Sequence, residues 1–202
     1  GITTPDDARL AADAGADAIG INFYASSPRF VEPDQAKKIA AAVGNAVAVV
    51  GVFVNESAER IKQLMEEVPL DFVQLHGDEP PDFLEQLDVR RVIKAFRSRD
   101  DGLQPVADYL AACGFAPAAV LIDAHAPGHY GGTGVSLDWA AVGKDTSLPK
   151  NIPLILAGGL TGENVAEAIR LAGPFGVDVA SGVESSPGVK DEEKVRAFDE
   201  NA

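Results

Sequence analysis

Asp123 has the residue type and the position expected of a general acid. It ends an apolar run over residues 119–123 that predicts a buried strand, and in parallel β/α folds the reacting groups stand at the carboxyl ends of strands. A carboxylate at the mouth of an apolar strand is partly desolvated, which favours its protonated form and suits it to donate a proton. A helix cap or an ion pair with a neighbour is the alternative.

Two glycine-bearing loops near the end of the chain are candidates for phosphate binding. Gly158 and Gly159 follow one apolar run, and Ser181 and Gly182 follow the next. Glycine lets backbone amides approach a phosphate closely, and the last two βα loops of a barrel are a common phosphate site. A simple chain reversal explains either loop alone, but the pair in consecutive loops favours phosphate binding.

Three further polar residues stand near predicted strand ends. In so acidic a protein, Arg29 is a candidate clamp for a carboxylate, with a surface salt bridge as the alternative. His76 either positions substrate or hydrogen-bonds the neighbouring strand, and the sequence does not separate the two. Asp178 lies within the last predicted strand, and we expect it to order the substrate-binding mouth rather than to react.

The remaining chemistry-bearing residues are less specific. The stretch 127–134 holds four glycines and predicts either a mobile lid or a plain surface loop. Cys113 comes late in a predicted helix, and we expect it to pack in or near the core. His125 and His129 lack a metal-ligand spacing with carboxylates, and no dinucleotide fingerprint follows the early strands. We therefore expect neither a metal nor a cofactor.

Apolar, β-branched runs alternate with amphipathic stretches along the chain. The predicted strands cover residues 16–23, 46–54, 71–75, 92–96, 119–123, 153–157 and 177–180. The predicted helices cover residues 4–14, 35–43, 57–68, 81–87, 103–113, 164–171 and 192–198. A helix comes first, with Thr4 and Pro5 as its start signal. Seven strands after an unmatched leading helix suggest eight βα units whose first strand is missing.

This alternation predicts a parallel sheet with helices outside it. An open doubly wound sheet and a closed barrel both satisfy the pattern, but a unit repeat of roughly 25 residues favours the barrel. No linker or composition shift divides the chain, so we expect a single domain over residues 1–202. The predicted fold is α/β, a parallel (β/α)8 TIM barrel with the first strand missing from the sequence as given.

The composition narrows the range of partners. The 202 residues carry 17 Lys and Arg against 31 Asp and Glu, a formal net charge of −14. This charge repels nucleic acid and anionic membranes, so an anionic substrate needs a local pocket of hydrogen-bond donors. A single cysteine and the lack of an apolar run of membrane-spanning length indicate a cytoplasmic protein. Nothing in the sequence requires more than a monomer.

Together these residues resemble the phosphoribosylanthranilate isomerase family of tryptophan biosynthesis. The matching segments are 1–3 (GIT), 13–23 (DAGADAIGINF), 27–30 (SPRF), 50–55 (VGVFVN), 73–77 (VQLHG), 121–123 (LID), 130–134 (YGGTG), 158–160 (GGL) and 177–184 (VDVASGVE). Each segment alone is unspecific. The set is specific because it covers nearly the whole chain in family order.

The resemblance implies a cofactor-free Amadori rearrangement of N-(5-phosphoribosyl)anthranilate to 1-(2-carboxyphenylamino)-1-deoxyribulose 5-phosphate. An acid protonates the furanose ring oxygen, and the ring opens to a Schiff base. A base then removes the C2′ proton to give an enolamine, which tautomerises to the ketone. By resemblance, Asp123 is the acid, Arg29 holds the anthranilate carboxylate, and the loops at 158–159 and 181–182 hold the phosphate.

One part of the family's pattern is missing from the sequence. The family's general base is a cysteine directly before the Gly-Ile-Thr that begins this chain, and Cys113 does not match that position. We therefore expect roughly ten further residues before Gly1 in the natural protein, one strand with a short lead. The only methionine, Met65, is not at the start, which agrees with this expectation. The chain as printed is then expected to be inactive or impaired.

Two other functions remain open from the sequence. Another phosphate-sugar barrel, such as a ring-closing synthase or an epimerase, needs a catalytic lysine or a metal pair at strand ends. Lys94 is the one lysine placed in that way. A non-catalytic barrel that binds a phosphorylated metabolite, as a sensor or a degenerate enzyme, is the other alternative.

Overall fold

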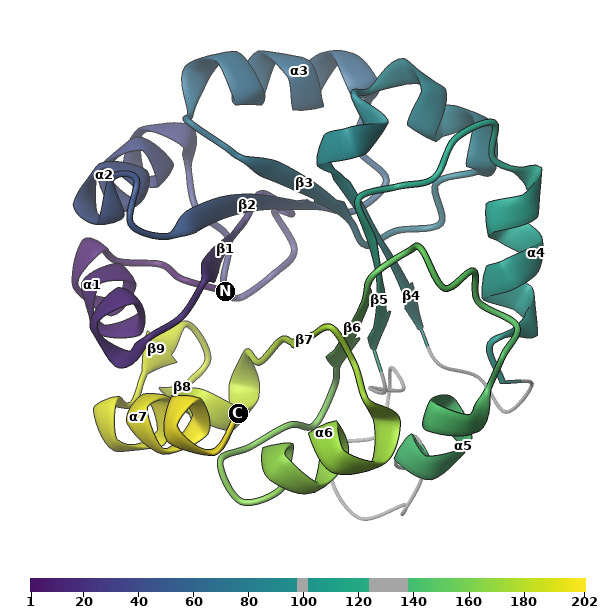
Figure 1. The fold of residues 1–202 in the computed structure, drawn as a ribbon. Helices are drawn as coiled ribbons and strands as arrows, with labels where there is room; N and C mark the ends of the chain where they lie inside the picture. The colour runs from purple at the N-terminus through teal and green to yellow at the C-terminus, as the bar shows by residue number, and fades with distance from the viewer. Residues whose placement is uncertain (98–101, 124–137) are drawn as a thin grey trace.

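A computed structural model describes residues 1–97, 102–123 and 138–202. Its main sheet has seven strands, hydrogen-bonded in the order β1 to β7. They are β1 Ala18–Asn22, β2 Ala48–Phe53, β3 Phe72–Leu75, β4 Val92–Arg97, β5 Ala119–Asp123, β6 Leu154–Ala157 and β7 Gly176–Val177. Every neighbouring pair is parallel, and the sheet curls with the helices on its outside (Figure 1).

Seven α-helices lie in the described part of the chain. They are α1 Pro5–Ala14, α2 Pro33–Val43, α3 Ala58–Glu67, α4 Gln104–Ala112, α5 Trp139–Lys144, α6 Val165–Ala172 and α7 Glu192–Asn201. Short 3-10 turns, η1 Pro81–Gln86, η2 Val89–Arg91 and η3 Ser181–Val183, and an antiparallel hairpin, β8 Glu184–Ser186 with β9 Val189–Lys190, complete the set. α1 begins as its sequence predicts, because the Thr4 side chain accepts the Asp7 N–H and Pro5 opens the helix.

The structure confirms the seven predicted strands and the leading helix. The last strand is shorter than the predicted range 177–180, because the chain turns into η3 directly after it. The helical turn predicted over 81–87 is a 3-10 helix. The sequence analysis missed α5 and the β8–β9 hairpin, since both are short and α5 has only six residues.

The core has two layers. Large clusters pack between the outer face of the sheet and the helices, with Leu75 and Val73 of β3 among their members. A smaller cluster joins alternate residues of β2 to β6 on the inner face: Val50, Phe72, Ile93, Ala95, Ala119, Leu121, Ile155 and Ala157. Side chains alternate between the two faces of the sheet along a strand. A polar residue two positions after an inner residue therefore also faces inward.

The N-terminal segment runs beside β1. The Ile2 N–H donates to the Gly20 carbonyl over 2.8 Å, and the Thr3 hydroxyl donates to the Gly188 carbonyl in the β8–β9 turn over 2.5 Å. This short segment therefore links the first strand to the hairpin that follows η3. Within the described ranges, no helix combines the length and apolar character needed to cross a bilayer.

Candidate active site

Strand alternation brings polar side chains to the carboxyl end of the barrel. On β5, Leu121 belongs to the inner cluster, so Asp123, two residues further on, faces the same way. On β3, the inner residue Phe72 is followed with the same period by Gln74 and His76. The two strands are parallel and flank β4, so their ends lie close together.

His76 contacts the candidate acid directly. Its Nε2 lies 3.3 Å from Asp123 Oδ2, and its Nδ1 lies 2.9 Å from the side-chain nitrogen of Gln74. The Gln74 nitrogen can only donate, so Nδ1 accepts and Nε2 carries the proton that His76 offers to Asp123. The His76 and Asp123 side chains are 23% and 22% exposed, so a small molecule can reach both. The backbone N–H of His76 also donates to Phe53 of the neighbouring strand over 2.8 Å.

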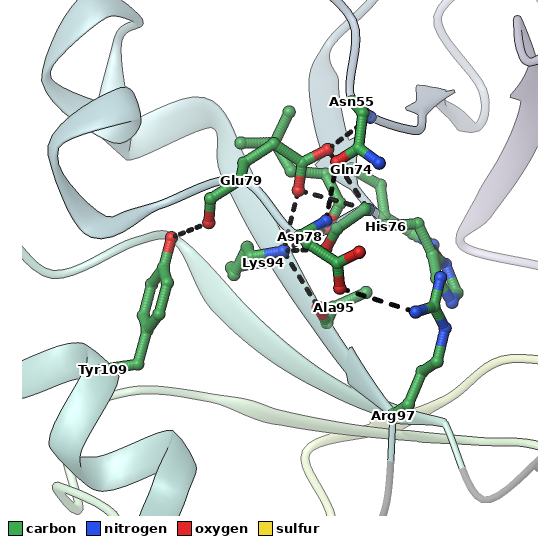
Figure 2. A network of polar contacts seen from close by, with 11 residues as sticks. Asn55, Gln74, His76, Asp78, Glu79, Lys94, Ala95, Arg97 and Tyr109 are labelled. Carbon is green, nitrogen blue, oxygen red and sulfur yellow. Dashed lines mark hydrogen bonds and ion pairs between the residues drawn. The ribbon is translucent and has the colours of Figure 1, made fainter.

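Lys94 does not reach the barrel mouth. It lies on the outer face of β4 beside Tyr109 of α4, and its side chain is 3% exposed (Figure 2). Its Nζ is 2.8 Å from Glu79 Oε2 and 2.8 Å from the Gly77 carbonyl. Burial lowers the pKa of Lys94, against the opposing effect of the Glu79 carboxylate. A lysine held in this way gives no support to a lysine-dependent synthase or epimerase.

The two glycine loops meet one another. Gly158 and Gly159 have φ angles of 89° and 69°, which side-chain-bearing residues rarely adopt. Gly182 is required for a different reason, because a Cβ there would overlap the carbonyl oxygen of Leu160 in the other loop. Ser181, beside Gly182, begins η3. The two loops therefore form one packed unit, an arrangement compatible with a shared anion site.

A side chain from the segment that follows each loop holds it in place. Asn164 accepts the Thr161 N–H over 2.9 Å and donates to the Gly159 carbonyl over 3.0 Å. Lys190, on β9, donates to the Ala180 carbonyl over 3.1 Å. These contacts stabilise the conformation of both loops.

Arg29 belongs to a charged cluster at the end of the second glycine loop. Its Nε and Nη2 donate to the two carboxylate oxygens of Glu184 over 2.7 and 2.6 Å. Lys190 lies 3.2 Å from the same carboxylate, and Asp178 is near enough to raise the pKa of Lys190, against the dominant effect of burial. Burial alone would raise the pKa of Glu184, but the hydrogen bonds and charges of Arg29 and Lys190 outweigh it and keep that pKa low.

The sequence analysis gave no role to Glu184, Lys190 or Glu79, although their side chains are among the most buried charged groups. A weak signal was present for Glu184, which stands directly after the Ser-Gly-Val of the second glycine loop. The partners of Glu79 and Lys190 come from separate elements, and no spacing in the sequence indicates them.

Several predicted features fall elsewhere. The proposed lid at 127–134, with His125 and His129, lies outside the described residues. Cys113 follows α4, is half-buried against the helix-side core as predicted, and has a thiol pKa raised by burial. Among the residues that the structure describes, no three His, Cys, Asp or Glu side chains are grouped to hold a metal ion.

Comparisons with known proteins agree over almost the whole chain. A family model described as N-(5'phosphoribosyl)anthranilate (PRA) isomerase matches residues 1–201. The N-(5'-phosphoribosyl)anthranilate isomerase of Trichlorobacter lovleyi is 47% identical over 204 residues, which cover 100% of this chain and 95% of that protein.

Solved structures of the same family also resemble this chain. The crystal structure of phosphoribosyl anthranilate isomerase from Thermotoga maritima superposes with a TM-score of 0.87 at 37% identity, covering 99% of this chain and 94% of that one. A phosphoribosyl anthranilate isomerase in complex with reduced 1-(o-carboxyphenylamino)-1-deoxyribulose 5-phosphate gives a TM-score of 0.83 at 35% identity, with the same coverage. With the curled parallel sheet, these likenesses confirm the predicted β/α barrel fold class.

Proposed function

Because this chain belongs to the N-(5'-phosphoribosyl)anthranilate isomerase family, we propose how its residues divide the work of that family's reaction. The function is the isomerisation of N-(5'-phosphoribosyl)anthranilate in tryptophan biosynthesis, and the substrate is a small phosphorylated molecule. The family match over residues 1–201 carries this assignment. A barrel that only binds a metabolite is not favoured.

Asp123 is the general acid that protonates the furanose ring oxygen. The contact of His76 with Oδ2 supports this role, because a protonated carboxyl group accepts at one oxygen and donates from the other. In this arrangement Oδ2 is the oxygen that accepts from His76. Gln74 keeps the His76 ring in the tautomer that donates to Asp123. His76 also lines the substrate site.

The phosphate is held by the two glycine loops. Gly158, Gly159 and Gly182 let backbone amides approach its oxygens, and the Ser181 hydroxyl adds a donor. Contact between the loops supports this proposal, since one phosphate then receives donors from both. Asp178, whose charge acts on Lys190 beside them, is proposed to order this mouth.

Arg29 holds the carboxylate of the anthranilate ring. Glu184 accepts from Nε and Nη2, which fixes the guanidinium plane for contact with the substrate carboxylate. Lys190 balances the charge of Glu184 and ties it to the Ala180 carbonyl of the phosphate loop. One polar chain thus connects the two proposed anchors of the substrate.

The second proton transfer is proposed from family resemblance alone. The expected base is a cysteine directly before Gly1, and Cys113 lies beyond the end of α4 against the helix-side core. We propose that a polypeptide of these 202 residues alone turns over slowly or not at all. Adding an N-terminal strand that ends in cysteine should restore turnover. Full activity of the 202-residue polypeptide would contradict this part of the proposal.

The formal charge of −14 supports a small anionic substrate held by local donors, and not a nucleic acid or a membrane partner. We propose that the enzyme acts in the cytoplasm as a monomer without a cofactor. Sedimentation at several concentrations checks the monomer, and a mass that rises with concentration would exclude it.

Fluorescence-monitored turnover of N-(5-phosphoribosyl)anthranilate tests the proposed function. The parent protein in this and the later kinetic tests carries the N-terminal strand that ends in cysteine. It should convert the substrate, and Asp123→Asn should lower kcat by about 100- to 10,000-fold, the usual effect of losing a general acid. Asp138→Asn, which alters only the cap of α5, is the matched control and should leave kcat unchanged. Full activity of Asp123→Asn removes Asp123 as the acid, while binding without turnover by the parent favours the non-catalytic alternative.

A further inference from the structure

The turn after β3 is built around a buried ion pair that the reaction, as proposed, does not use. The side chains of Glu79 and Lys94 are 2% and 3% exposed, and 2.8 Å separates Oε2 from Nζ. Figure 2 shows the pair between the end of β3, strand β4 and helix α4. A well-packed apolar pair of similar volume is often at least as stable as a buried ion pair, so stability alone does not explain it.

The Glu79 carboxylate joins three segments of the chain. Its Oε1 accepts the N–H of Asn55, which follows β2, over 2.9 Å and the N–H of Gly77 over 3.1 Å. The Tyr109 hydroxyl donates to the Glu79 carbonyl over 2.9 Å and so adds α4 (Figure 2). Burial would raise the pKa of Glu79, but the hydrogen bond and charge of Lys94 outweigh it and keep this carboxyl group ionised.

The residue types in the turn are those that this carboxylate requires. Asn55 has a φ of 52°, the one positive value among the non-glycine residues of the described ranges, and its Oδ1 accepts the Asp78 N–H over 2.7 Å. A Cβ at Gly77 would lie 2.6 Å from both the Asn55 nitrogen and Glu79 Oε1, closer than side chains pack. The turn over 76–79 therefore has little freedom to move.

We propose that Lys94 and Glu79 are positioning residues that hold the 76–79 turn so that the His76 ring reaches Asp123. The contact between His76 and Asp123 is 3.3 Å, already long for a hydrogen bond, so a displacement of about 1 Å breaks it. This inference rests on the proposed role of Asp123 as the acid. It adds that a buried pair outside the substrate site sets the geometry of proton transfer.

The double variant Glu79→Gln with Lys94→Met tests the proposal. It removes both charges, and the Gln oxygen can still accept the Asn55 and Gly77 N–H groups. We expect kcat to fall by about 5- to 10-fold, as much as the loss of the His76 imidazole itself would cause, because the contact between His76 and Asp123 is lost. KM should stay within about twofold, because Arg29 and the glycine loops lie on other strands.

A spectroscopic measurement separates positioning from a loss of folded protein. The imidazole Cε1–H resonance of His76, assigned by its absence in His76→Asn, should shift in the folded double variant. Two controls should leave both kcat and this resonance unchanged. Asp78→Asn removes the exposed ion pair with Arg97 from the same turn and keeps the Asp78 N–H that Asn55 accepts. Arg91→Met removes hydrogen bonds to the backbone carbonyls of Leu70 and Asp71, just before β3, and should lower the melting temperature.

Asn55→Gly provides a milder variant should the double variant fail to fold. It keeps the positive φ and the N–H bonded to Glu79, and loses only the bond to the Asp78 N–H. We expect kcat to fall by about 2- to 5-fold and the His76 resonance to shift in this variant too. Unchanged kcat and an unchanged resonance in the folded variants would overturn the positioning role. Full activity of Asp123→Asn would instead overturn the proposed acid.

Discussion

The proposed phosphate side and the proposed acid side of the site are built in different ways. On the phosphate side, after β6 and β7, the binding surface is backbone, exposed by Gly158, Gly159 and Gly182. On the acid side, after β3 and β5, the working groups are the side chains His76 and Asp123. The first surface depends on side chains being absent, and the second depends on side chains from separate strands meeting at the right distance.

This difference predicts two kinds of failure. Adding atoms on the phosphate side blocks contact with the anion and should mainly raise KM. Removing atoms on the acid side leaves the anchors intact and should mainly lower kcat. Arg29 is intermediate, because it is a side-chain anchor whose orientation depends on Glu184.

Among the binding residues, the largest expected effect is at Gly182. Gly182→Ala places a Cβ into the Leu160 carbonyl and separates the two glycine loops. Losing charge-assisted hydrogen bonds to the phosphate should raise KM by about 100-fold with a smaller change in kcat. Steady-state kinetics with a thermal melt measures both effects. Gly176→Ala on β7 is the matched control, since its Cβ would meet nothing within 4 Å. An unchanged KM in Gly182→Ala would show that the loops need not touch.

Arg29→Met should give the next largest effect. It removes the proposed clamp for the substrate carboxylate, so KM should rise by about 10- to 30-fold. The Glu184 carboxylate keeps only Lys190, so the melting temperature should also fall. Arg90→Met removes an exposed ion pair with Asp88 and should change neither quantity. A lower melting temperature with unchanged KM would reduce Arg29 to a structural role.

His76→Leu should have a smaller effect, and it should change kcat and not KM. Without the imidazole, Asp123 loses the donor at Oδ2, and kcat should fall by about 5- to 10-fold at nearly constant KM. Full progress curves at saturating and limiting substrate separate the two constants. A rise in KM larger than the fall in kcat would place His76 among the binding groups instead.

The smallest expected effect is on stability in acid. The pKa values of Glu79 and Glu184 in the folded protein lie below the ordinary value of 4.5. Such groups stabilise the folded state above that pH, and their contribution is lost as the pH falls through the lowered folded values. Urea unfolding should therefore show the free energy of unfolding decreasing below about pH 4.5. Glu184→Gln should flatten this decrease, and Glu192→Gln, in an exposed ion pair, should not.

The same comparison explains what the sequence could predict. The seven strands follow from apolar β-branched runs, and the glycine loops follow from residue type and place along the chain, because both signals are local. Asp123 and His76 could be named as strand-end residues, but their contact depends on two strands that are not neighbours in the sheet. In the sequence, Lys94 could be taken for a catalytic lysine at a strand end. The structure instead places it on the outer face of β4, against Glu79.

Contacts between residues that are far apart in the chain could not be predicted from the sequence. Arg29 and Glu184 are 155 positions apart, and neither type nor spacing predicts that they form a bidentate pair. α5 and the β8–β9 hairpin are too short to produce a periodic pattern. The β8–β9 hairpin carries Glu184 and Lys190, which contact the proposed anchor Arg29 and the second glycine loop, and the sequence did not predict these contacts.

The central claim is that binding and proton transfer reside in separate halves of the site. Calorimetric titration with the reduced product analogue, alongside turnover, tests it in Asp123→Asn and Gly182→Ala. The account predicts that Asp123→Asn binds the analogue within about threefold of the parent while its kcat falls by at least about 100-fold. Gly182→Ala should lose about 100-fold in affinity and keep most of its kcat. Equal losses of affinity in the two variants, or full turnover by Asp123→Asn, would contradict the account.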